Sequence, residues 1–308
     1  MLRFNEKQIA ENLDRINKRK AILESAVQSV VTGFSPAMFL WGPPGLGKSH
    51  VLTTLLDGLA AKGWIHHTAY STPKALMLSI AESPTAIHVF EDCERMLKTD
   101  LSASILRAAC GAPADRVRYV TWETANERFK IKFLGSVVIV TNQNLAKLSG
   151  PMQGVASRFR PIKWDMTLEE RCSIILDLGK RSATKGGMAL TPKECTKVAK
   201  RLIEMVSESQ LEFDLDIRLF TEHALPAFAQ AKAHPGLNWE DLMMAKLMGS
   251  AQTVEETQQD RTRRLEQLAQ AIDLEGGNTK SKIAKWKSLT ELGQAIYYRH
   301  LRNARKQK

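Results

Sequence analysis

Residues 37–49 have the sequence Ala-Met-Phe-Leu-Trp-Gly-Pro-Pro-Gly-Leu-Gly-Lys-Ser. The apolar run from Met38 to Trp41 predicts a buried strand, and the spacing of the leucines from Leu52 to Leu59 predicts a helix. Glycine lacks a Cβ atom, so the turn between strand and helix can wrap closely and point its N–H groups at phosphate oxygens. Strand, glycine-rich turn and helix together predict a P-loop, with phosphate at the N-terminus of the helix.

The side chains that open this helix suit a nucleoside triphosphate and its metal ion. Lys48 would reach the β and γ phosphates, and the hydroxyl of Ser49 would hold Mg²⁺. A chance match in a glycine-rich turn is the alternative, and the agreement of strand, loop and helix weighs against it. The predicted nucleotide-binding residues are Gly42, Pro43, Pro44, Gly45, Leu46, Gly47, Lys48, Ser49 and His50.

Length and composition narrow the class of protein. At 308 residues the chain can bury a substantial core, and two or three domains are expected. The four cysteines have no paired spacing, which favours neither a zinc site nor a disulfide framework, so we expect a protein of the reducing cytoplasm. No run of residues is long and apolar enough to suggest a membrane span, so we expect a soluble protein without a membrane partner.

The net charge of +11 is concentrated at the C-terminal end. Residues 279–308 contain nine Lys or Arg against one acid, Glu291, which gives +8 there and leaves +3 for the rest of the chain. A basic surplus gathered in one segment indicates a polyanionic partner for that segment.

Two further apolar runs end in polar residues that a P-loop enzyme needs. The run from Ala86 to Phe90 is followed by Glu91 and Asp92, and the run from Ser136 to Val140 by Thr141 and Asn142. Carboxylates opposite the phosphates can hold Mg²⁺ and deprotonate the attacking water. We assign Glu91 to the metal and Asp92 to the base, and we expect Asn142 to position the water. The alternatives are ordinary surface acids at a strand end, and an asparagine that only makes a turn.

Residues 116–133 alternate in polarity on either side of a polar turn, which predicts a β-hairpin. One face of it would carry Arg116, Arg118, Lys130 and Lys132. Such a face could follow DNA or could simply be solvated, and the sequence leaves both interpretations open.

These motifs together resemble the AAA+ ATPase superfamily, over about residues 35–235. The segments that carry the resemblance are GPPGLGKS at 42–49, the acids that close the strand at 87–92, TN at 141–142 and SRF at 157–159. The resemblance implies an α/β fold, a P-loop NTPase αβα core with a five-stranded parallel sheet, followed by an all-α lid. It also implies ATP and Mg²⁺ as cofactors, ATP hydrolysis, and a ring of identical subunits with ATP between them.

The resemblance assigns further roles. Glu91 and Asp92 would be the Walker B acids and Asn142 the first sensor. Arg158 would be the arginine finger that reaches the γ-phosphate bound by the neighbouring subunit, and Arg160 is the second candidate for that role. Arg218, in Asp216-Ile-Arg218, would be the second-sensor arginine.

The chain also departs from the family. The acids stand in the order Glu-Asp where Asp-Glu is usual, which leaves their roles in doubt. The segment Tyr70 to Lys74 lacks the pore loop of protein unfoldases, so threading of protein is disfavoured.

The predicted domains are a core over 1–165 with a helical N-terminal lead, a helical lid over 166–250, and a linker helix with a basic tail over 251–308. The tail has the pattern of a helix-turn-helix, in which Ile283, Ala284 and Trp286 face inward on the first helix and Leu289 to Gly293 form the turn. It resembles the tails of ATPases carried by phages and mobile elements. A disordered basic tail, or a helical pair that caps the lid, is the alternative. The predicted DNA-binding residues are Lys280, Lys282, Lys285, Lys287, Gln294, Tyr298, Arg299 and Arg302.

The sequence thus predicts an AAA+ ATPase that acts on DNA, in replication or mobilisation of a phage or mobile element. Remodelling, unwinding and helicase loading all fit, with a helicase or recombination protein as partner. Two other functions stay open. One is a nucleotide switch that assembles on DNA with little turnover, and the other is a chaperone-like remodeller of a protein partner.

Overall fold

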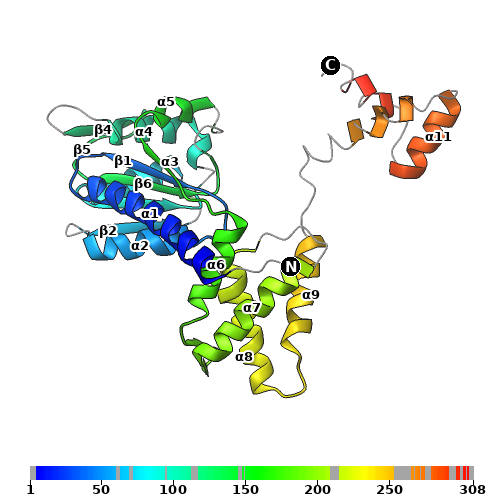
Figure 1. The fold of residues 1–308 in the computed structure, drawn as a ribbon. Helices are drawn as coiled ribbons and strands as arrows, with labels where there is room; N and C mark the ends of the chain where they lie inside the picture. The colour runs from blue at the N-terminus through cyan, green and yellow to red at the C-terminus, as the bar shows by residue number, and fades with distance from the viewer. Residues whose placement is uncertain are drawn as a thin grey trace. The chain divides into compact units, whose positions relative to one another are not determined.

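The chain is described from a computed structural model, drawn as a ribbon in Figure 1. It divides into two compact units, Met1–Met243 and Met244–Lys308, which are taken one at a time. The residues that the structure describes are 5–59, 63–68, 72–93, 96–111, 117–144, 148, 150–208, 215–252, 265–266, 268–270, 272–274, 279–290, 296–298, 301–302 and 304.

A five-stranded parallel sheet forms the centre of the first unit, in the order β2-β3-β6-β1-β7. The strands are β1 (Ala37–Trp41), β2 (Trp64–Thr68), β3 (Ile87–Glu91), β6 (Ser136–Thr141) and β7 (Arg160–Lys163). Because all five run the same way, their carboxyl ends meet at one edge. The P-loop follows β1, Asp92 follows β3 and Asn142 follows β6, so the fold brings the predicted motifs to that edge.

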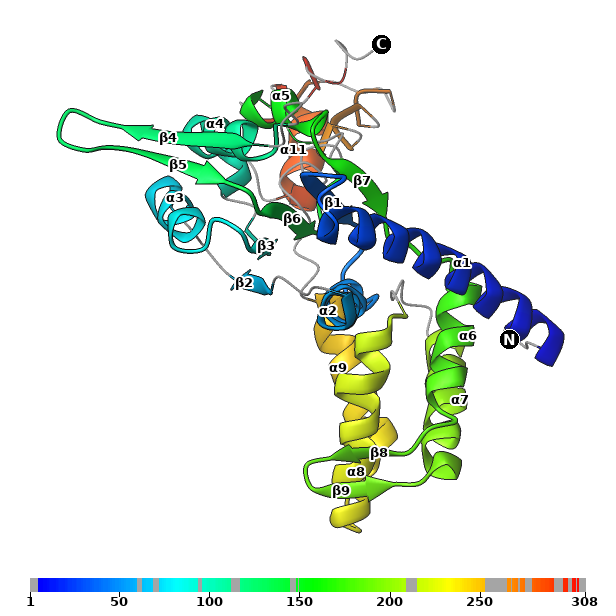
Figure 2. The ribbon, with the colours of Figure 1, turned by 90° about the vertical axis from the view of Figure 1, so that its left-hand side faces the viewer.

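Alternating side chains on the strands build a core on each face of the sheet. Met38 and Leu40 pack in the cluster that includes α1 (Glu6–Val31) and α2 (Lys48–Leu59). Ala37 and Phe39 point the other way, into the cluster formed with α3 (Pro73–Glu82) and α4 (Asp100–Ala109). Figures 1 and 2 show these helices on opposite faces of the sheet. The predicted αβα core is confirmed.

The long helix α1 joins the core to the next part of the first unit. Its buried Asn12 donates to the hydroxyl of Ser173 at 3.0 Å, and Arg19 forms a 2.5 Å ion pair with Glu170, which is 1% exposed. Both partners lie on α6 (Leu168–Leu178). Glu170 also forms a capping box with Thr167 at the start of α6, so one carboxylate both caps α6 and pairs with α1.

The segment that follows the core is helical, as predicted, and we call it the lid. Its helices are α6, α7 (Pro192–Glu208), a π-helical turn (Leu219–Ala224), α8 (Leu225–Ala233) and the start of α9 (Trp239–Gln252), which belongs to the second unit from Met244 onward. The lid also contains a two-stranded hairpin of β8 (Ala183–Lys185) and β9 (Met188–Leu190), which the sequence analysis did not predict.

Two short 3-10 turns complete the described part of the core. One (Met96–Lys98) precedes α4, which begins where the hydroxyl of Thr99 accepts from the backbone nitrogen of Ser102. The other (Gly150–Met152) precedes the short helix α5 (Gln153–Ala156).

The predicted β-hairpin is present as β4 (Arg118–Glu123) and β5 (Arg128–Phe133), and it extends beyond the sheet in Figure 2. The prediction that Arg118 shares a face with the lysines was wrong. Arg118 pairs with Phe133, is 7% exposed, and donates to the carbonyls of Ala109 and Gly135. Lys130 and Lys132 lie on the opposite, outer face, which side-chain alternation dictates once this register is set. Arg116 lies outside the described residues.

The second unit has a core of its own. The cluster comprises Leu265, Ala269, Ile272, Trp286, Tyr297 and Leu301. Trp286 lies on α11 (Thr279–Thr290), is fully buried, and contacts Tyr297 with ring centroids 5.4 Å apart. Two details of the prediction were wrong: Ala284 is exposed, and α11 continues to Thr290, past the expected start of the turn at Leu289.

Across the described part of both units, no helix is long and apolar enough to cross a membrane. The segment Tyr70 to Lys74, where no pore loop was found in the sequence, is described only from Thr72 onward.

Candidate nucleotide-binding site

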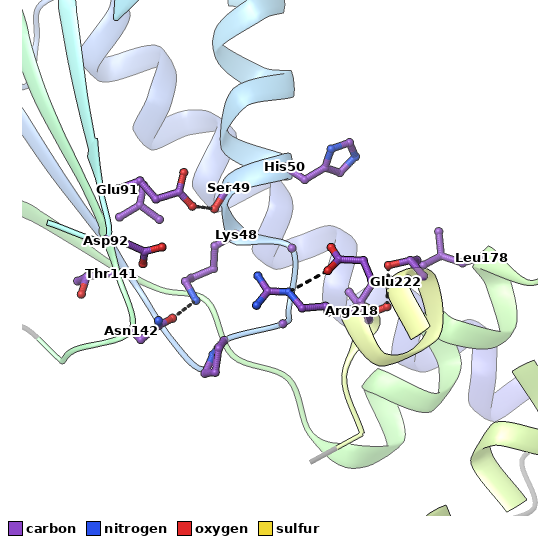
Figure 3. Close-up of a pocket in the computed structure, with 16 residues that line it drawn as sticks. Lys48, Ser49, His50, Glu91, Asp92, Thr141, Asn142, Leu178, Arg218 and Glu222 are labelled. Atoms are coloured by element: carbon purple, nitrogen blue, oxygen red, sulfur yellow. Dashed lines mark hydrogen bonds and ion pairs between the residues drawn. The ribbon is translucent and has the colours of Figure 1, made fainter. Parts of the chain in front are cut away.

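A cavity of about 490 Å³ lies at the carboxyl edge of the sheet, between the P-loop and the lid of the first unit (Figure 3). The core contributes the P-loop, the acids after β3 and the polar residues after β6. The lid contributes the last residue of α6 and residues within and just before the π-helical turn. The lining residues are Pro44, Gly45, Gly47, Lys48, Ser49, His50, Glu91, Asp92, Val140, Thr141, Asn142, Leu178, Ile217, Arg218, Thr221 and Glu222.

The P-loop needs its glycines for two different reasons. Gly45 and Gly47 have φ values of +76° and +74°, a left-handed conformation that strains residues with a Cβ atom. At Gly42 the reason is space, because a Cβ atom would lie 1.8 Å from the carbonyl oxygen of Trp164. Trp164 also donates from its indole nitrogen to the carbonyl of Leu46 at 2.9 Å, which fixes the turn from the side of β7.

Lys48 begins α2 and is 7% exposed. Its ammonium group donates to the carbonyls of Gly42 at 2.9 Å and Pro43 at 2.7 Å, and to Oδ1 of Asn142 at 2.8 Å. Burial lowers the pKa of Lys48. The carboxylate of Asp92 opposes this shift of the pKa, and the guanidinium of Arg218 adds to it. A cation held this way can exchange its carbonyl partners for phosphate oxygens.

Glu91 and Ser49 meet on the other side of the cavity. The Ser49 hydroxyl donates to Oε1 of Glu91, and His66 lies 2.7 Å from Oε2 through its Nε2 atom. A hydroxyl and a carboxylate side by side are the hard oxygen ligands that Mg²⁺ prefers, so these residues fit that ion. The sequence analysis assigned Glu91 to the metal, and that assignment stays a prediction.

Asp92 follows Glu91 with a φ of +52°, the left-handed conformation that aspartate tolerates better than most residues with a side chain. Its backbone N–H donates to the carbonyl of Val140 at 3.3 Å, so the turn after β3 is tied to β6. The Asp92 carboxylate is exposed and lies between Glu91 and Asn142 in Figure 3. An exposed carboxylate beside the phosphate end of the cavity can accept a proton from water.

The lid closes the far side of the cavity. Arg218 forms an ion pair with Glu222 at 3.6 Å, and both side chains are more than half exposed (58% and 61%). Leu178, Ile217 and Thr221 complete this wall and give it an apolar part. Phosphate-binding groups at one end and apolar side chains at the other suit a nucleotide.

The two arginines predicted as fingers do not line this cavity. Arg158 is exposed and donates from Nη1 to the backbone carbonyl of Arg107 at 2.9 Å. Arg160 is exposed within β7. Neither side chain therefore serves the cavity of its own chain.

The predicted DNA-binding residues belong to the second unit. Lys285 and Lys287 on α11 are exposed, as are Tyr298 and Arg302 in the last helical stretch. Lys282 donates to the carboxylate of Asp273 at 2.9 Å and to its carbonyl at 3.1 Å. Gln294, Arg299 and the side chain of Lys280 lie outside the described part of the chain.

Sequence reasoning missed several residues of the site. His66 has no motif around it, and its contact with Glu91 depends on the pairing of β2 with β3. Leu178, Thr221 and Glu222 come from the lid, where no motif marks a residue that faces the nucleotide. Glu222 alone had a local signal, since it stands four residues after Arg218 and opposite charges at that spacing meet on a helix.

Comparisons with known proteins add little to this description. No protein-family model matches the chain, and no curated protein sequence matches it. Among solved structures, three mutant forms of RuvB from Thermotoga maritima are similar to 92–93% of this chain, which covers 87% of each. Their sequence identity is 13–14% and their TM-scores are 0.38–0.43. At these values the similarity supports no conclusion about this chain, and its fold is assigned from the strand order and register given above.

Proposed function

We propose that this chain is a magnesium-dependent ATPase of the AAA+ type that acts on DNA. The observation that carries the proposal is the meeting of Lys48, Ser49, Glu91, Asp92, Asn142 and Arg218 around one cavity. These groups are a buried cation, a hydroxyl, two carboxylates, an amide and a guanidinium. That set matches a triphosphate with its metal ion and an attacking water.

In the proposed reaction each group has one task. Lys48 leaves the carbonyls of Gly42 and Pro43 to bind phosphate, while Ser49 and Glu91 hold Mg²⁺. Magnesium, when bound, neutralises part of the phosphate charge. Asp92 accepts the proton of the attacking water, and Asn142 orients that water.

Arg158 completes the proposed site from a neighbouring subunit. Its exposure, and the fact that it does not line its own cavity, support a role in trans. An arginine brought to the γ-phosphate of another copy stabilises charge that develops in the transition state. The proposed assembly is therefore a homo-oligomer, most simply a ring.

The proposed DNA partner binds the second unit. Its exposed Lys285, Lys287 and Arg302 can contact phosphates, and the exposed Tyr298 can contact bases. The proposed role is in replication or mobilisation of a phage or mobile element, by remodelling, unwinding or helicase loading.

Single-turnover ATP hydrolysis, measured with and without DNA, tests the proposal. We expect DNA to stimulate the wild-type protein strongly and to leave Lys48→Ala inactive. Binding of DNA with almost no stimulation would favour the nucleotide switch instead. Failure to bind either ATP or DNA would rule out the proposed function.

A further inference from the structure

The carbonyl group of Gly45 joins the P-loop to the lid segment that carries Arg218. It accepts hydrogen bonds from the backbone nitrogens of Ile217 at 3.1 Å and of Arg218 at 3.3 Å. In a planar trans peptide, the next N–H points opposite to the carbonyl. The two bonds therefore turn the N–H of Leu46 away from the lid segment, which is how a P-loop presents its amides to phosphate.

Asp216 lies at this junction and contacts both sides of it. Its Oδ1 atom accepts a hydrogen bond from the backbone nitrogen of Leu219 at 2.6 Å. Asp216 stands three residues before this donor, which is the arrangement of a helix N-cap. Its Oδ2 atom lies 1.8 Å from the point where a Cβ atom on Gly45 would stand. One carboxylate thus begins the helix that carries Arg218 and packs against the backbone of the P-loop.

The side chain of Arg218 has no other strong support in the part of the chain that the structure describes. Its ion pair with Glu222 joins two mostly exposed groups at 3.6 Å, and such pairs contribute little. The helix is also irregular here, because the π-helical turn begins at Leu219, directly after the arginine. The position of Arg218 therefore depends on its backbone, and the backbone depends on Gly45 and Asp216.

We propose that Asp216 is a positioning residue for ATP hydrolysis. It holds the helix that carries Arg218 against the P-loop, so that the position of the arginine and the orientation of the Gly45–Leu46 peptide are fixed by the same contact. This inference rests on the proposed function, because it treats Arg218 as a group that binds phosphate. Asp216 itself touches no phosphate in the proposal.

The test compares Asp216→Ala with Asp216→Asn and with a matched control, Thr191→Ala. Asparagine keeps an oxygen that can cap the helix, whereas alanine does not. Thr191 caps another lid helix, α7, by accepting from the nitrogen of Glu194 at 3.3 Å, and it does not line the cavity. The readouts are kcat and KM for ATP, affinity for a fluorescent ATP analogue, and the melting temperature.

We expect Asp216→Ala to lower kcat/KM by about fivefold or more, as the loss of a cap that holds a phosphate-binding group implies. Asp216→Asn should stay within about threefold of wild type. Thr191→Ala should melt earlier by a similar amount but hydrolyse ATP normally. In the background of Arg218→Ala, removal of the Asp216 carboxylate should add little further loss of rate, because both changes disable the same group.

Several results would overturn the inference. Normal kinetics of Asp216→Ala would do so, as would equal losses for the alanine and asparagine variants, or full additivity with Arg218→Ala. These results require a wild-type protein that hydrolyses ATP, and they leave the proposed function standing. A wild-type protein without ATPase activity would overturn the proposed function and this inference together.

Discussion

The ammonium group of Lys48 and the side-chain oxygen of Asn142 are 2.8 Å apart, although ninety-four positions separate the two residues in the chain. The contact exists because β1 and β6 are neighbours in the sheet with Trp41 opposite Thr141, so the residues that follow the two strands meet. The cation proposed to bind phosphate and the residue proposed to orient water are thereby linked.

This contact predicts different effects for its two members. Lys48→Ala should abolish ATP binding, because no other described lysine lines the cavity. Asn142→Ala should bind ATP but hydrolyse it on the order of a hundredfold more slowly, as expected when one polar group that acts in the transition state is lost. Equilibrium binding and single-turnover rates separate the two effects, with Gln143→Ala as the control. Retained affinity in Lys48→Ala would disprove the P-loop assignment.

Arg158→Ala should bind ATP normally and lose hydrolysis by on the order of a thousandfold, as removal of an arginine finger does. Action in trans is tested by mixing Arg158→Ala with Asp92→Ala and measuring the ATPase activity of the mixture. One interface in such a mixture pairs an intact cavity with an intact arginine, so part of the activity should return. Arg160→Ala is the comparison variant, and a larger loss there would transfer the role to Arg160.

The lysines of α11 should differ in their contribution to DNA binding. Lys287→Ala should lower affinity and reduce the slope of log K against log salt by about 1, as expected for one lost phosphate contact. Lys282→Ala should leave that slope unchanged and lower the stability of the second unit, because its ion pair with Asp273 is lost. Salt titrations by fluorescence anisotropy measure both slopes. Equal slopes for the two variants would contradict this division.

Acid should destabilise the first unit through His67. Burial, followed by the charges of His88 and His66, lowers the pKa of His67 from 6.5 to about 4. Between these values the unfolded chain binds a proton that the folded chain does not. The free energy of unfolding should therefore fall with decreasing pH across this window, by at most about 1.4 kcal/mol per pH unit for this group.

Urea denaturation between pH 4.5 and pH 7.5 measures this dependence. His67→Gln cannot take up the proton, so its dependence on pH should be shallower than that of wild type. His234→Gln is the control, because His234 is exposed at the end of α8. An unchanged pH dependence in His67→Gln would exclude His67 as the cause.

The sequence by itself determined the P-loop, the strands that end in Glu91 and Asn142, and hence the αβα core. These features depend on local chemistry: a turn that needs glycine, apolar runs that must be buried, and polar groups at strand ends. It could not determine which way Arg118 points, because that side chain changes face with a shift of one residue in strand register.

Only the tertiary structure decided which residues share the cavity and which cations are already paired. Glu222 joins the nucleotide site through the placement of the lid, and Lys282 is bound by Asp273 from another segment. Asp216 meets Gly45 across 171 positions of chain, and no periodicity of the sequence encodes that approach. Contacts of this kind depend on how separate elements pack, because each element alone leaves the position of its partner undetermined.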